Sequence, residues 1–153
     1  MMNSEFFMAC QKGNTAKVAS LLVDSLMDVN QARDDDVTPF YVACEEGHKE
    51  VVALLLADAR VDVNQVDSNG ATPFYIACLA GHKEVVELLL ADARVGVKQA
   101  RYDGVTPFFI ASQKGHKEVI TLLLADARVD MHRVRYDSAR LFYIACRNSA
   151  LHH

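Results

Sequence analysis

The sequence has no tryptophan, only three prolines, and no uninterrupted apolar stretch longer than the seven residues at 51–57. A membrane-spanning helix needs about 20 consecutive apolar residues, so we expect none. The first ten residues contain neither a basic segment nor a long apolar one, and no signal peptide is expected. A formal net charge of −4 argues against a dedicated DNA- or RNA-binding protein, which would carry a strong basic excess. Because charged and apolar residues are well mixed over 153 positions, we expect one globular, intracellular domain, most simply a cytoplasmic one.

Sequence motifs of catalysis, nucleotide binding and metal binding are missing as well. The chain contains no GxSxG, GxGxxG or HExxH pattern, no P-loop, and no CxxC pair. We therefore expect no enzymatic activity, no cofactor, no metal and no small-molecule substrate.

The three prolines lead to what the chain does contain. They stand at 39, 73 and 107, at intervals of 34 residues, and each belongs to a Thr-Pro-Phe triplet. A fixed period of this length is typical of a solenoid. The period divides a single domain, 1–153, into a degraded first unit at 4–37, full repeats at 38–71, 72–105 and 106–139, and a partial last unit at 140–153.

Each full repeat predicts two short helices followed by a tight turn. In the first full repeat, Thr38 can cap the first helix, and Pro39 suits its first position, where no N–H donor is needed. Gly47 is expected to end this helix in a left-handed conformation. The second helix, from 48 to 57, is apolar on nearly all sides and needs neighbouring repeats to cover it.

The segment TPFYVACEEGHKEVVALLL and the DVN that follows resemble the ankyrin repeat. Two features depart from the family pattern. Aromatic residues such as Phe40 and Tyr41 replace the family's leucine and histidine, so its Thr–His hydrogen bond is excluded. The unit also exceeds the family's usual length of about 33 residues, and the extra residue lies in the Asp-Ala-Arg segments at 58–60, 92–94 and 126–128. The resemblance implies an all-α ankyrin solenoid of stacked helix-turn-helix units and a non-catalytic module that binds proteins.

The two ends of the array differ from its middle. Lys17 and Ser20 replace apolar residues of the following repeat, which is typical of an N-terminal capping repeat. The last unit, 140–153, has lost the Thr-Pro start, so it is either a minimal cap or part of a longer array. The terminal His152 and His153 are either native residues or the remnant of an expression tag.

Cysteines and histidines recur with the repeat, which favours structural roles. The cysteines occupy one repeat position, at Cys10, Cys44, Cys78 and Cys146, with Ser112 in the remaining unit. Equivalent residues of packed helices lie about 8–10 Å apart, beyond the reach of a disulfide, so we expect four buried free thiols. The histidines at 48, 82 and 116 begin the second helices, where we expect them to cap or bridge turns rather than bind metal.

Residues that differ between repeats gather just before each Thr-Pro and at the end of each first helix. In proteins that resemble this one, these turn tips and helix ends line a concave groove that binds partners. The predicted partner-binding residues are Asp34, Asp35, Glu45, Glu46, Ser68, Asn69, Leu79, Ala80, Arg101, Tyr102, Asp103, Gln113, Lys114, Arg135, Tyr136, Asp137 and Arg147. Exposed residues also vary without a function, and the alternative is a structural or engineered repeat scaffold without a dedicated partner.

Two features favour a binding groove. Tyr102 and Tyr136 occupy the same turn position in adjacent units, and Leu79 introduces an apolar contact at an otherwise polar position. Residues 1–76 carry 5 basic and 12 acidic residues, net −7, whereas residues 77–153 carry 11 basic and 8 acidic residues, net +3. We expect a monomer whose charged groove orients a protein partner.

Overall fold

The computed structural model describes residues 4–151, and these residues form paired helices without any strand. The helices are α1 (Ser4–Lys12), α2 (Thr15–Leu22), α3 (Pro39–Glu46), α4 (Lys49–Leu56), α5 (Pro73–Ala80), α6 (Lys83–Leu90), α7 (Pro107–Gln113), α8 (Lys117–Ala125) and α9 (Met131–Leu151). His152 and His153 lie outside the described residues.

The first helices of the full repeats begin through the same local chemistry. Thr38, Thr72 and Thr106 have extended backbones, and each hydroxyl accepts the N–H three residues further on, at 2.9–3.1 Å. A proline follows at the first helical position in every case. Gly47 and Gly81 end α3 and α5 with φ of 78° and 77°, a conformation that costs other residues more. The predicted helix starts and glycine ends are confirmed.

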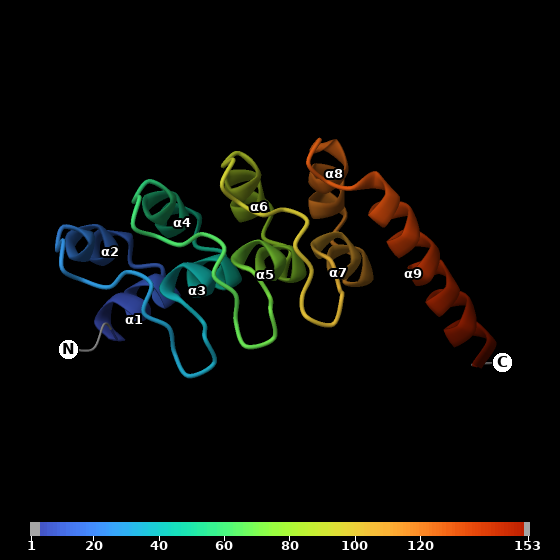
Figure 1. Ribbon diagram of the computed structural model, residues 1–153, viewed down its shortest axis with the longest axis horizontal. Coiled ribbons are helices and arrows are strands. Elements are labelled where there is room, and N and C mark those ends of the chain that lie inside the picture. The colour runs from blue at the N-terminus through green and yellow to red at the C-terminus, as the bar shows by residue number, and fades with distance from the viewer. Residues whose placement is uncertain (1–3, 152–153) are drawn as a thin grey trace.

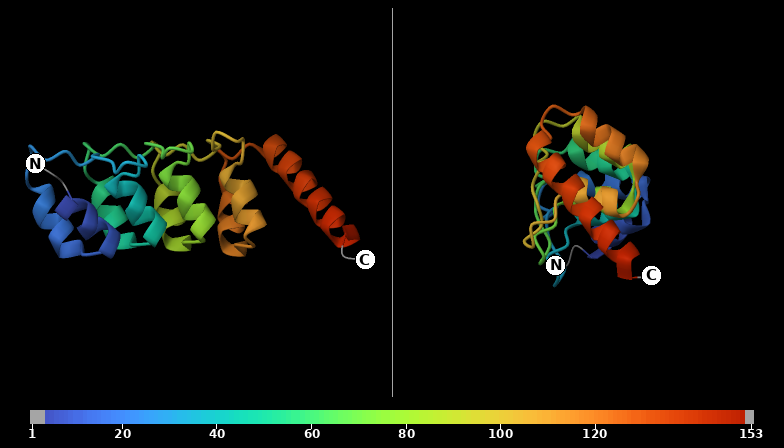
Figure 2. Two further views of the ribbon diagram at one scale, coloured as in Figure 1. Left: turned by 90° about the horizontal axis from the view of Figure 1, so that it is seen from below. Right: turned by 90° about the vertical axis from the view of Figure 1, so that its right-hand side faces the viewer.

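The helix pairs stack side by side in two rows (Figure 1). Helices α1, α3, α5 and α7 form one row, and α2, α4, α6 and α8 form the other, with each helix in contact with its neighbours along the row. The loops that join one helix pair to the next lie along one side of the stack (Figure 2). Between the rows, Val51, Val52 and Leu55 of α4 are completely buried. Since each such side chain stabilises the fold by about 1.5–3 kcal/mol, stacking is what holds these short helices together.

A histidine bridge joins successive repeats. Nε2 of His48, His82 and His116 lies 2.8 Å from the main-chain oxygen of a residue near the end of the preceding first helix. These histidines occupy the N-cap position of their own helices but make no side-chain cap hydrogen bond. Of the two roles expected for them, bridging is confirmed and capping is wrong.

The Asp-Ala-Arg segments form a second bridge on the other side of the stack. Arg60, Arg94 and Arg128 are each held by the aspartate two residues earlier. Each guanidinium also donates to the carbonyl at the end of the preceding second helix, that of Leu22, Leu56 or Leu90. The longer repeat therefore places a cation at the C-terminus of a helix, where it is favoured by the helix dipole.

The turn predicted around Tyr136, before the last unit at 140–153, is wrong, because α9 runs without a break from Met131 to Leu151. At the corresponding positions, earlier repeats have a residue of positive φ followed by Thr-Pro, and both features stop a helix from passing through. Here Ser138, Arg140 and Leu141 stand in their place, and nothing interrupts the helix. Figure 2 shows α9 leaning away from the stack.

The course of α9 also changes the place of one cysteine. Cys10, Cys44 and Cys78 are buried, as predicted, but Cys146 is exposed, so the expectation that it is buried is wrong. Its neighbour Phe142 is 72% exposed, although Phe40, Phe74 and Phe108 at the same repeat position are buried. Within residues 4–151, no helix has the length and apolar character needed to cross a bilayer.

Candidate functional site

The loops before α3, α5 and α7 form a connected row of turn tips. The main-chain N–H of Ser68 donates to the Asp35 carbonyl at 3.0 Å, and that of Tyr102 donates to the Asn69 carbonyl at 3.1 Å. Within each tip, an aspartate side chain accepts further main-chain N–H groups, as Asp67 does from Asn69 and Ala71. These bonds fix the backbone of the tips while their side chains stay exposed.

A shallow hollow lies between the second and third tips. Its lining residues are Ser68, Asn69, Arg101, Tyr102 and Asp103, all of them predicted partner-binding residues. The Tyr102 side chain is 75% exposed, yet its ring lies against Gly70 of the preceding tip. Because Gly70 has no side chain, an aromatic ring is held in place there and one face remains open to a ligand.

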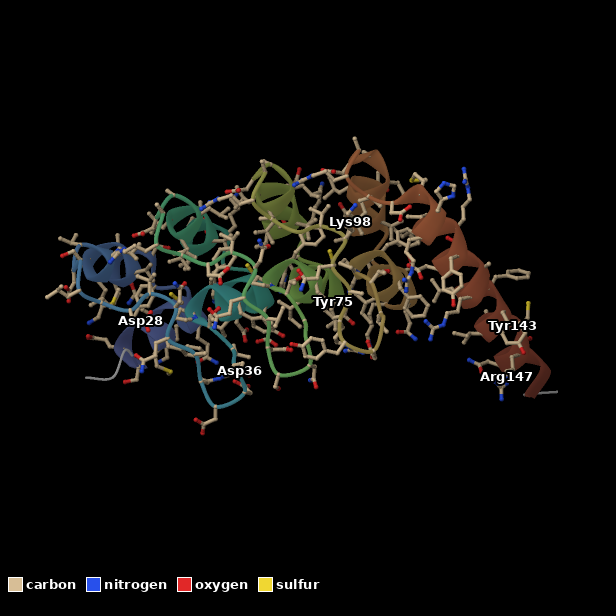
Figure 3. The ribbon with its side chains drawn as sticks, viewed as in Figure 1. Asp28, Asp36, Tyr75, Lys98, Tyr143 and Arg147 are labelled. Atoms are coloured by element: carbon tan, nitrogen blue, oxygen red, sulfur yellow. The ribbon has the colours of Figure 1, made fainter. Side chains whose placement is uncertain are left out.

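A row of aromatic rings lies behind the tips, and the sequence analysis did not assign it to the site. The guanidinium of Arg33 lies 4.9 Å from the centre of the Phe7 ring, and that of Arg101 lies 5.3 Å from the Tyr75 ring. Figure 3 shows Tyr75 at the middle of the molecule. The signal for this row was the aromatic residue at the fourth position of each repeat, in place of the family's histidine.

Tyr41 and Tyr75 belong to this row but bond differently. The Tyr41 hydroxyl donates to Asp67 at 2.7 Å, and burial together with the Asp67 carboxylate raises the pKa of Tyr41 well above its usual range. The Tyr75 hydroxyl is buried and has no hydrogen-bond partner among the described residues. The difference follows from the turn residue 26 positions after each tyrosine. Asp67 accepts the hydrogen bond of Tyr41, whereas Arg101, at the same position of the next repeat, is a donor and cannot accept one from Tyr75.

The ends of the first helices form the opposite border of the site. Glu45 and Leu79 are half-buried, and Glu46, Gln113 and Lys114 are exposed. The main-chain oxygens of Glu45 and Leu79 each lie 2.8 Å from a histidine of the next repeat, which fixes these helix ends in position. Ala80, also half-buried, follows Leu79, so the apolar spot predicted there is small.

The pKa of Glu45 shows that the end of α3 and the turn tips share one electrostatic environment. Burial first, and then the neighbouring Glu46, raise the pKa of Glu45; Asp35 and Asp67 of the turns add to this effect. Arg33 opposes the rise, but it is paired with Asp35 at 3.0 Å and lowers the pKa of that carboxyl instead. This end of the site therefore holds more carboxylates than cations.

Four of the predicted site residues belong to α9 instead. Arg135, Tyr136 and Asp137 were expected at a fourth turn tip, but they belong to α9, for the reason given above. Asp137 is completely buried and accepts a hydrogen bond from the Thr106 hydroxyl at 2.6 Å and another from Arg133 at 3.0 Å. It therefore attaches α9 to α7 and is not available to a partner. Arg147 lies near the far end of α9 (Figure 3).

Residues 4–151 contain no cluster of three or more potential metal ligands. Burial raises the pKa of the Cys10 thiol to about 12 and raises those of Cys44 and Cys78 further, so these thiols stay protonated and unreactive at neutral pH.

Stacked helix pairs joined by capped loops define a helical repeat solenoid. The sequence model described as "Ankyrin repeats (3 copies)" matches residues 6–67 and 59–135, so the chain belongs to the ankyrin-repeat family. No curated protein matches the sequence. Ankyrin repeats generally act as protein–protein interaction modules and are typically non-catalytic.

Proposed function

We propose that the surface between the turn tips and the first-helix ends, here called the groove, binds a protein partner. The observation that carries this proposal is the hollow between the second and third tips, where Tyr102 is held open over Gly70. A rigid, exposed tyrosine beside an arginine is typical of residues that contribute most to binding energy. Ordering such a surface costs little free energy on binding, because its backbone is already hydrogen-bonded.

The charges along the groove favour a partner with a particular distribution of charge. Its first half has exposed carboxylates at Asp34, Asp36 and Glu46, whereas in its second half Arg101 is paired with Asp103 at 2.6 Å and Lys114 is exposed. A partner with basic residues at one end and acidic residues at the other would be oriented along the groove and would associate faster than a neutral one.

The test compares proteins retained from a lysate by the full chain and by two variants. Tyr102→Ala should reduce the retained partner at least about tenfold, the loss of a hot-spot side chain. Glu87→Ala, an exposed change on α6, is the matched control and should leave retention unchanged. Equal retention by the wild type and Tyr102→Ala would contradict the proposal, and retention of no protein by any of them would favour the scaffold without a partner.

A further inference from the structure

Helix α9 exposes an unusual amount of aromatic surface. Tyr136, Phe142 and Tyr143 are 61%, 72% and 65% exposed, whereas Val134 and Asp137 on the opposite side are buried against the array. Tyr136 and Tyr143 are seven residues apart and so lie on the same side of the helix. Exposed aromatic residues gathered on one helix are typical of an interaction surface.

Two arginines of α9 have no partner among residues 4–151. Arg133 is bound to Asp137 and Arg140 lies over the Phe109 ring, but Arg135 and Arg147 form no ion pair or hydrogen bond there. Arg135 lies seven residues before Phe142 and shares its side of the helix, so a charge stands within the apolar surface. Such a charge disfavours insertion into a membrane, and it favours a partner that supplies a carboxylate at a fixed place.

The complementary surface is at the other end of the same molecule. Asp34, Asp36 and Glu46 are exposed and form no ion pair within the described residues. The pKa of Glu45 beside them is raised, first by burial and then by the charge of Glu46. Asp36 lies in the N-terminal half of the structure, and the α9 residues Tyr143 and Arg147 lie at its opposite end (Figure 3). The two surfaces therefore cannot meet within one molecule.

We propose that α9 of one molecule binds the acidic half of the groove of a second copy. Arg135 and Arg147 are separated by 12 residues, about 18 Å along the helix. Asp34 and Asp36 lie in the loop before α3, and Glu46 is the last residue of α3, so exposed carboxylates stand both at the turn tip and at the helix end. The two arginines diverge by about 120° around the helix axis and so lie at the two edges of its exposed side. From there they can pair with the carboxylates of the turn tip and of the helix end, while the aromatic side chains between them cover the first-helix ends.

This contact is head to tail. Each molecule that binds through its α9 keeps its own groove free, so further copies can add and short chains form. Pairing of two α9 helices is less favourable, because each carries unpaired arginines and the like charges repel. The inference rests on the proposed function of the groove, since the same surface binds the second copy and competes with any other partner for it.

The first experiment is sedimentation velocity of the full chain over a range of concentrations, in about 0.05 M and about 0.5 M salt. At low salt we expect species larger than the monomer whose fraction rises with concentration. At high salt they should dissociate, because the Debye length falls and the exposed charges are screened. A monomer at every concentration in low salt overturns the inference.

The second experiment uses two complementary variants of the full chain. The tail variant carries Arg135→Glu and Arg147→Glu, and the groove variant carries Asp34→Lys and Glu46→Lys, all at exposed positions. Each variant alone should associate at least about tenfold more weakly than the wild type. An equimolar mixture should form a 1:1 dimer and nothing larger, because the intact groove of the first binds the intact α9 of the second.

Controls separate this inference from loss of folding and from the proposed function. Glu84→Lys with Glu87→Lys makes the same change of charge on the exposed side of α6 and should leave association unchanged. Helicity by circular dichroism should be the same in all variants. If the tail variant associates as strongly as the wild type, the inference is overturned. If the wild type stays monomeric but the groove variant loses a partner captured from a lysate, only the binding of a second copy is overturned, and the proposed function stands.

Discussion

At the scale of single residues, the left-handed glycines connect one repeat with the next. Gly47 has a φ of +78°, and a Cβ atom there would lie 2.7 Å from the His82 ring, whose Nε2 is bonded to the Glu45 carbonyl. Gly13 and Gly81 stand in the same relation to His48 and His116. The glycine therefore ends a helix and also leaves room for the histidine bridge.

Replacement of this glycine should cost more inside the array than at its end. In Gly47→Ala, the left-handed conformation of the alanine costs about 1–2 kcal/mol. The added Cβ must also displace the His82 ring, so the free energy of unfolding should fall by more than this backbone cost. Gly115→Ala is the matched control: its φ is +75°, but nothing lies within 4 Å of the added Cβ, and only the backbone cost applies. Urea denaturation of both variants measures the difference. Equal losses of stability would show that the histidine contact contributes nothing.

At the scale of helices, the sequence predicts the start of α3, α5 and α7 correctly because Thr, Pro and Gly act locally. The histidine bridge joins residues 37 positions apart, and its acceptor is a main-chain oxygen that the sequence does not single out. The same holds for the turn tips, whose linking bonds run between main-chain groups. The turn predicted within α9 is wrong because Ser138 and Arg140 replace the residues that break the helix in the earlier repeats.

The exposed Cys146 distinguishes the continuous helix from a further repeat. At low protein concentration and high salt, where α9 is unbound, the native protein should react with a thiol reagent at Cys146 alone. The three thiols at Cys10, Cys44 and Cys78 should react only after unfolding, since burial raises their pKa and excludes the reagent. Mass spectrometry of the labelled protein identifies the sites. Protection of Cys146 in the native monomer would mean that this segment packs as an ordinary first helix.

At the scale of the whole molecule, the arginine bridges make stability depend on pH through a repeated unit. Asp58, Asp92 and Asp126 each accept from the arginine two residues on, and this bond lowers the pKa of each carboxyl below its usual value. A carboxyl whose pKa is lower in the folded protein stabilises the fold at neutral pH. Its contribution is lost as the pH falls from the ordinary value of about 3.9 through the lowered one.

Asp35 and Asp103 of the turn tips are also held by an arginine that lowers their pKa, which makes five such aspartates. Removing one should therefore reduce the acid sensitivity that they share by about a fifth, as expected for contributions that add between neighbouring units. Asp92→Asn removes the central titrating group, and the fall in the urea midpoint between about pH 7 and about pH 3 should be correspondingly smaller than in the wild type. Glu87→Gln, an exposed change on α6 for which the structure gives no ion pair, should leave that fall unchanged. An acid response of Asp92→Asn equal to that of the wild type would mean that the Asp–Arg pairs do not set the pH dependence. In that case the arginines would hold the repeats together through the helix carbonyls alone, since a guanidinium stays charged across this whole range.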